Sequence, residues 1–124
     1  MSLKNLSQWI PLGNVPELSA EDLNQKLGND ELQIVDVRTP QEWNVSRIAN
    51  AINLPITQFS AANIEALNLD KNKTTITICL SAHRSIPAVR QLQSMGFTHC
   101  MQLKGGMLSW WKKDFATMSK RKVD

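Results

Sequence analysis

The chain has 124 residues, enough for one domain with one hydrophobic core and too few for two. Its hydrophobic content of 42% and charged content of 20% are ordinary for a folded domain and exclude a disordered chain. The net charge of +3 is modest, and much of it lies in Lys112, Lys113 and the run 120–122. A nucleic-acid-binding protein usually interleaves such charges with exposed aromatic residues or carries a recognisable binding module. Neither is visible, so we expect no nucleic-acid partner.

The two ends of the chain differ from its middle. Residues 1–14 show no clear period and predict an arm packed on a domain over 15–118, followed by a basic tail over 119–124. The N-terminus lacks the apolar core of a signal peptide, and no apolar run is long enough to span a bilayer. We therefore expect a cytoplasmic protein with reduced cysteines. The oligomeric state stays open between a monomer and a weak homodimer.

The first predicted elements are a helix, a strand and a second helix. The stretch from Ser19 to Gly28 predicts a helix, with the Ser19 hydroxyl as its cap and the glycine at its end. The apolar run 32–37 predicts a buried strand. Thr39 as a cap and Pro40 in the first turn then predict a short helix directly after that strand.

Strands and helices alternate through the rest of the chain. The predicted elements are a strand over 51–55, a helix over 59–67, a strand over 75–79, a helix from 85 to 96, a strand over 97–103 and a helix over 107–118. This alternation is typical of a parallel sheet covered on both faces. We predict an α/β fold with about five parallel strands and helices on both faces.

Cys79 lies where the predicted strand over 75–79 ends, just before a helix. In open α/β sheets, ligands bind at the carboxyl ends of strands, where helix N-termini present unpaired N–H groups and a partial positive charge. Ser85 predicts the N-cap of the following helix, and Pro87 falls in its first turn. A cysteine at such a place has its thiolate stabilised.

The loop after Cys79 is suited to an anion. None of the residues from Leu80 to Arg84 is acidic, so their N–H groups can form an anion-binding nest around the sulfur. Arg84 adds a fork of donors that can hold a sulfonate, sulfate or carboxylate. These features indicate a nucleophilic cysteine facing an anionic substrate. The alternative is that Cys79 is only a small buried hydrophobic residue.

Three other residues could take part in chemistry. His83 could act as a general base, but we expect its side chain to point outward. His99 and Cys100 are adjacent, so on a strand they face opposite sides and make a poor metal pair. We expect Cys100 to be a core residue and expect no metal site.

Four segments in order resemble the rhodanese-like sulfurtransferase domain over about residues 15–113. They are 36–43, 48–55, 79–85, and 103–106 with Trp110. The resemblance implies a single rhodanese-like domain in which Cys79 becomes a persulfide. The Cys79 thiolate attacks the outer sulfur of a small anionic donor such as thiosulfate and passes that sulfur to cyanide, a thiol or a protein acceptor.

The resemblance also assigns roles to neighbouring residues. The substrate-binding residues that it implies are Leu80, Ser81, Ala82, His83, Arg84 and Ser85. Asp36 and Arg38 are implied to hydrogen-bond backbone near the loop and so to hold it rigid. No metal or organic cofactor is implied.

Two departures from the family pattern and two alternative functions bear on this prediction. Ala82 stands where the family usually has glycine, so we expect a positive φ there, at a cost of about 1 kcal/mol. Arg47 stands where the family often has histidine, and we expect it to point to water. A phosphatase is disfavoured, because four residues separate Cys79 from Arg84 where related phosphatases have five. A non-catalytic interaction module is the other alternative; the presence of both Cys79 and Arg84 favours the enzyme.

Overall fold

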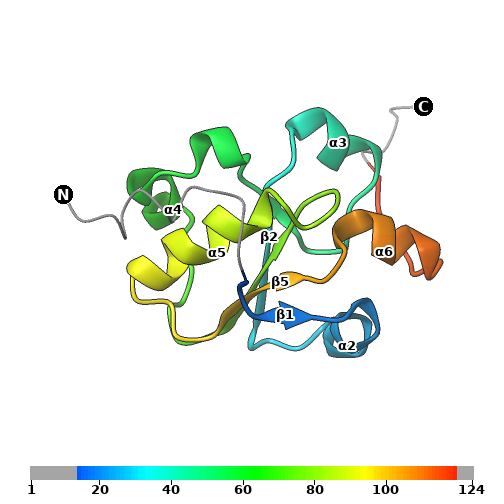
Figure 1. Cartoon of the computed structure of the whole chain (residues 1–124), viewed down its shortest axis with the longest axis horizontal. Helices are drawn as coiled ribbons and strands as arrows, with labels where there is room; N and C mark the ends of the chain where they lie inside the picture. Colours follow the sequence, from blue (N-terminus) through cyan, green and yellow to red (C-terminus); the bar gives the residue numbers. More distant parts are fainter. Residues whose placement is uncertain (1–13, 120–124) are drawn as a thin grey trace.

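In the computed structural model, which describes residues 14–119, five parallel strands form one sheet in the order β1-β5-β4-β2-β3 (Figure 1). The strands are β1 (Glu17–Leu18), β2 (Leu32–Asp36), β3 (Ile52–Asn53), β4 (Thr74–Ile78) and β5 (Cys100–Leu103). The prediction of a parallel sheet of about five strands is therefore confirmed. β4 is central, with β2 on one side and β5 on the other, so the end of β4 lies in the middle of the sheet's carboxyl edge.

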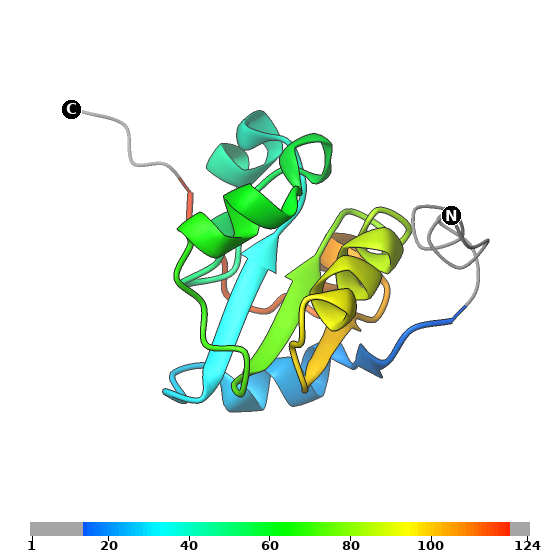
Figure 2. The same cartoon turned by 90° about the vertical axis from the view of Figure 1, so that its left-hand side faces the viewer.

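Helices cover both faces of the sheet, as predicted (Figure 2). They are α2 (Ala20–Lys26), α3 (Pro40–Val45), α4 (Ala61–Ala66), α5 (Ser85–Ser94) and α6 (Gly106–Lys112), with a 3-10 turn η1 (Ile56–Gln58). One core cluster joins α4 and α5 to the sheet through Ile64 and Leu92, and the other joins α2 and α6 through Leu23 and Trp110. The alternation of strands and helices along the chain produces this arrangement because each crossover returns to a parallel strand over one face.

Local capping chemistry explains where the first helices begin. The Ser19 hydroxyl accepts from the Asp22 N–H at 3.1 Å and caps α2. Thr39 and Glu42 form a reciprocal capping box at α3, in which Glu42 accepts from the Thr39 N–H at 2.9 Å. Both caps were predicted, but the role of Glu42 in the second was not.

Several element boundaries were predicted wrongly. The predicted helix over 107–118 ends at Lys112, because Asp114 adopts a φ of +57° and the chain then runs back to pair with Arg47 through Met118. β1 was not predicted; its two residues are held by pairing with β5. Arg47 does not simply point to water, since its guanidinium stacks 4.0 Å from the centroid of the Trp43 ring.

The predicted arm over 1–14 and tail over 119–124 fall outside the described residues except for Asn14 and Ser119, so both stay predictions. Among residues 14–119, no helix combines the length and the apolar character that crossing a membrane requires.

Candidate active site

Cys79 follows the last residue of β4 and lies five residues before Arg84, the residue that precedes α5. Its side chain is only 1% exposed and packs in the core cluster beneath α5. The neighbouring strand β2 ends at the same carboxyl edge of the sheet. Val37, the residue after β2, donates its N–H to the Ile78 carbonyl at 2.8 Å. The predicted position of Cys79 at a strand end, before a helix, is therefore confirmed.

The residues 80–85 that follow Cys79 form the loop called here the Cys79 loop. Hydrogen bonds from the beginning of α6 hold the backbone at Cys79 and Leu80, where this loop begins. The Met107 N–H donates to the Cys79 carbonyl at 2.8 Å, and the Leu108 N–H donates to the Leu80 carbonyl at 3.0 Å. This approach requires glycine at position 106, where φ is +59° and a Cβ atom would overlap both of those carbonyl oxygens. The second glycine of the 103–106 segment is thus explained by backbone contact with the loop.

The rest of the loop presents unpaired backbone donors. Within the part of the chain that the structure describes, the N–H groups of residues 80–85 donate to no protein acceptor. Ala82 adopts a φ of +81°, which confirms the positive φ expected where the family has glycine. A residue with positive φ among residues with negative φ turns successive N–H groups toward one concavity, which is the geometry of an anion-binding nest.

Arg84 does not stand free beside the loop. Its Nη1 and Nη2 atoms donate to Oε1 and Oε2 of Glu42 on α3, at 3.0 and 3.1 Å. The hydrogen bonds from Arg84 lower the pKa of Glu42 to about 2, and the bond to Glu42 is also the largest cause of a raised pKa at Arg84. The sequence analysis expected Arg84 to hold only a substrate anion and did not identify Glu42, although that residue lies in the resembling 36–43 segment.

Asp36 and Arg38 form a buried ion pair at 2.7 Å, with both side chains at most 1% exposed. Arg38 also donates to the carbonyl of Ser46 at 2.6 Å and to that of Glu42 at 3.4 Å. The bonds of this pair to backbone go to α3 and to the residue that follows it, rather than to the Cys79 loop itself. The pair fixes the helix that carries Glu42, and so supports Arg84 indirectly.

Ser85 was predicted as the N-cap of α5, and this is wrong. Arg84 occupies the cap position, and Ser85 is the first residue of the helix. The Ser85 hydroxyl is buried and has no hydrogen-bond partner among the described residues. Pro87 lies in the first turn, as predicted.

His83 and Cys100 behave as expected. His83 is exposed, and its Nδ1 atom lies 3.1 Å from the Ser81 hydroxyl, so it points away from the core. Cys100 is a free, buried cysteine, and its burial raises the pKa of its thiol to about 11. Cys100 is therefore a core residue rather than a second reactive thiol.

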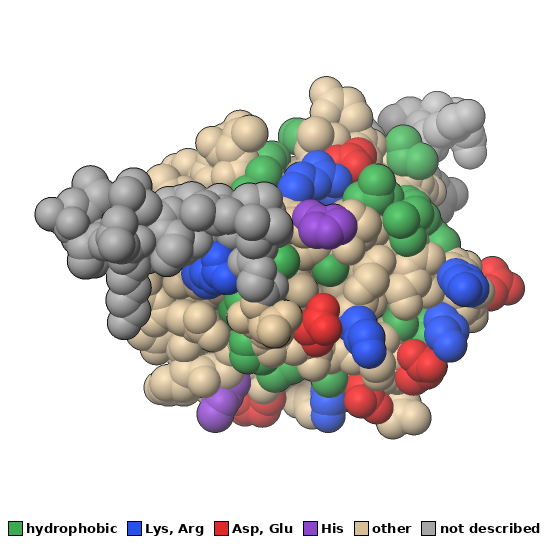
Figure 3. All heavy atoms as spheres, viewed as in Figure 1, with side chains coloured by type: hydrophobic (Ala, Val, Ile, Leu, Met, Phe, Trp, Pro, Cys, Tyr) green, Lys and Arg blue, Asp and Glu red, His purple; other side chains and the backbone are tan. Residues whose placement is uncertain are grey.

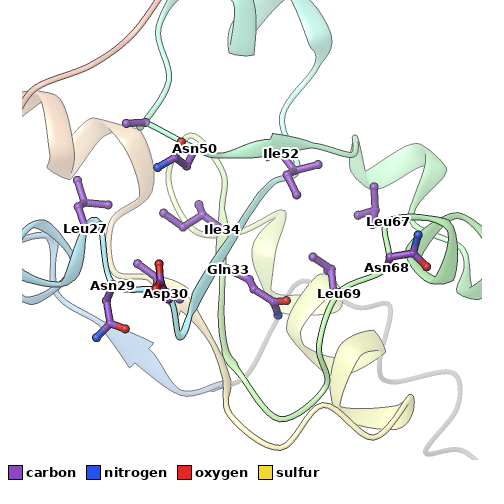
Figure 4. Close-up of a pocket in the computed structure, with 13 residues that line it drawn as sticks. Leu27, Asn29, Asp30, Gln33, Ile34, Asn50, Ile52, Leu67, Asn68 and Leu69 are labelled. Carbon is purple, nitrogen blue, oxygen red and sulfur yellow. The ribbon is translucent and has the colours of Figure 1, made fainter.

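Two hollows in the described surface differ in their relation to Cys79. One of about 240 Å³ lies beside the loop and is lined by Ser81, Ala82 and His83 together with Glu17 and Gln102. The other, of about 420 Å³, is lined by Leu27, Ile34, Ile52 and Leu69 among others, and no residue of the loop contributes to it (Figure 4). Basic and acidic side chains are mixed across the face drawn in Figure 3.

Known proteins are similar to this chain in sequence and in fold. A sulfurtransferase of Allochromatium vinosum is 31% identical over 77% of this chain and 88% of its own length. A crystal structure of a rhodanese-related protein from Thermoplasma volcanium superposes with a TM-score of 0.72, at 28% identity, over 84% of this chain and 98% of that one.

Other relatives are longer than this chain. The first curated relatives, from Synechocystis and Bacillus subtilis, are 31% and 32% identical over 82% and 81% of the chain. The chain spans about half of their length, 55% and 53%. A family model described as the rhodanese-like domain matches residues 19–113. That match covers most of the chain, and the chain therefore belongs to the rhodanese-like domain family.

Proposed function

We propose that this chain is a rhodanese-type sulfurtransferase that carries sulfur as a persulfide on Cys79. The observation that carries the proposal is the loop of residues 80–85, whose backbone N–H groups have no acceptor among the described residues and which follows the cysteine directly. Donors that are already oriented and unpaired stabilise negative charge without reorganisation. The charge to be stabilised is that of the Cys79 thiolate and of the terminal persulfide sulfur.

The reaction proceeds in two displacements. In the first, the Cys79 thiolate attacks the outer sulfur of thiosulfate; a new S–S bond forms, the old one breaks, and sulfite leaves with its electron pair. In the second, a thiolate or cyanide attacks the outer persulfide sulfur, and the Cys79 thiolate is the leaving group. The same group must act as nucleophile and leaving group, which a stabilised thiolate does well. The steps need a reduced thiol, so a reducing compartment such as the cytoplasm suits them.

The size of the loop favours sulfur over phosphate chemistry. Four residues separate Cys79 from Arg84, and the Cys79 and Leu80 carbonyls are tied to α6, which limits how far the loop can open. A sulfur atom is smaller than the phosphate group that a five-residue spacing admits in related phosphatases. A non-catalytic interaction module is the remaining alternative, and the experiment below separates it from the enzyme.

Intact-protein mass spectrometry after mixing the reduced protein with thiosulfate tests the proposal. The wild type should gain the mass of one sulfur atom and lose it again when cyanide is added. Cys79→Ser should gain nothing, while Cys100→Ala should behave as the wild type, because Cys100 lies in the core. If the folded wild type gains no sulfur from thiosulfate or from an alkyl persulfide, the chain is not this enzyme. An interaction module then becomes the better account.

A further inference from the structure

Arg84, near the end of the Cys79 loop, is paired with a carboxylate. Both terminal nitrogens of its guanidinium donate to Glu42, and the two side chains are 34% and 31% exposed. Glu42 is held independently of Arg84, since its Oε1 atom also accepts from the Thr39 N–H at 2.9 Å. The pair is therefore in place before any substrate arrives, and its net charge is zero.

Among the described residues, the charges of Arg38 and Glu17 do not replace the one that Glu42 cancels. Arg38 is balanced by Asp36 at 2.7 Å. On the opposite side of the loop, the hollow lined by Ser81 and His83 is also lined by Glu17, whose carboxylate accepts from Gln102 at 3.0 Å. Within residues 14–119, the N–H groups of residues 80–85 and the N-terminus of the ten-residue helix α5 attract an anion at Cys79 without a cancelling carboxylate.

We propose that Glu42 selects the sulfur donor by its charge, so that this site prefers an alkyl persulfide, with at most one negative charge, to dianionic thiosulfate. The inference rests on the sulfur-transfer function proposed above and names its donor class. Attraction to an unpaired guanidinium would grow with the charge of the ligand. Because Glu42 cancels the charge of Arg84, the loss of that attraction disfavours a dianion more than a monoanion.

The preferred donor reacts by a balanced displacement. The Cys79 thiolate attacks the outer sulfur of R–S–SH, the S–S bond of the donor breaks, and the thiolate R–S⁻ leaves with the electron pair. The transferred sulfur keeps its hydrogen, so Cys79 becomes Cys79–S–SH. No sulfite is released in this reaction.

The experiment compares two donors, thiosulfate and hydroxyethyl persulfide, by the rate at which each converts Cys79 to its persulfide. The variant is Glu42→Gln, which removes the negative charge but retains a residue that can form a capping box with Thr39. We expect the thiosulfate-to-persulfide ratio of second-order rate constants to rise about fivefold, because removal of one nearby charge changes dianion binding more than monoanion binding. The rise should shrink at high salt.

Two further variants separate charge from structure. The double variant Glu42→Gln with Arg84→Gln restores the net charge of the wild-type pair, so its donor ratio should return toward that of the wild type. Glu21 of α2 forms a surface ion pair with Lys113, the residue after α6. α2 lies on the far side of the molecule from α3 in Figures 1 and 2, so Glu21→Gln should leave the ratio unchanged.

The outcomes distinguish this inference from the function on which it rests. If Glu42→Gln changes both rate constants by the same factor, Glu42 acts only by positioning the loop, and the inference is wrong while the function stands. The inference is also wrong if the wild type reacts faster with thiosulfate than with the persulfide. If neither donor forms a persulfide on the folded wild type, the proposed function itself fails.

Discussion

Substitution of Gly106 by alanine tests how the Cys79 loop is held. A Cβ atom at this position would overlap the carbonyl oxygens of Cys79 and Leu80, and the residue has a φ of +59°. The left-handed conformation costs a non-glycine residue about 1 kcal/mol or more. Separation of α6 from the loop would in addition weaken two hydrogen bonds, of 2.8 and 3.0 Å, each with a net contribution of about 1 kcal/mol. We expect Gly106→Ala to lower the free energy of unfolding by about 3 kcal/mol.

Gly28→Ala is the matched control for this prediction. Gly28 also has a positive φ, +88°, but a Cβ atom there would meet no other atom within 4 Å. Its substitution should therefore cost only the backbone term, about 1 kcal/mol. Urea denaturation followed by tryptophan fluorescence measures both losses, and the rate of persulfide formation at Cys79 should fall in Gly106→Ala alone. Equal losses in the two variants, with unchanged sulfur transfer, would refute the argument that close backbone contact with α6 holds the loop.

Three further predictions concern charge and backbone at the same edge. Ala82→Gly relieves the positive φ of +81° but adds freedom to the unfolded chain, so its free energy of unfolding should lie within about 1 kcal/mol of wild type; a larger loss in urea denaturation would contradict this. Arg38→Met leaves Asp36 buried without its partner and should cost about 3–5 kcal/mol in the same assay, whereas a loss below about 1 kcal/mol would be inconsistent with a buried ion pair. The pKa of Glu42 is lowered from 4.5 to about 2, so the stabilisation by its pair with Arg84 is present above pH 4.5 and is lost as the pH falls toward 2. The stability difference between wild type and Glu42→Gln should shrink over that range, and a difference independent of pH would argue against the pair.

Local patterns were sufficient to predict most of the fold. Apolar or β-branched runs predicted the three long strands of the sheet, and the Ser19 and Thr39 caps predicted where two helices begin. These signals are local because capping and strand burial depend on residues a few positions apart. The position of Cys79 at a strand end followed from the same patterns, and the positive φ of Ala82 followed from the family resemblance.

Short or irregular elements could not be predicted in this way. β1 has two residues and no period of its own, and it exists because β5 pairs with it. The end of α6 depends on the return of the chain to Arg47, a contact between residues far apart in sequence. Ser85 satisfied the residue preference for an N-cap, yet the loop geometry moved the cap position to Arg84.

The sequence by itself determined the α/β fold and the cysteine at the carboxyl end of the central strand, because both follow from period, capping and the order of elements. Only the tertiary structure decided the charge of the site. Arg84 and Glu42 lie 42 positions apart. They meet because Arg38 and Asp36 fix α3 against the carboxyl edge of the sheet, where the Cys79 loop begins. Which carboxylate reaches an arginine depends on how two elements pack, and no local pattern along the chain records that distance.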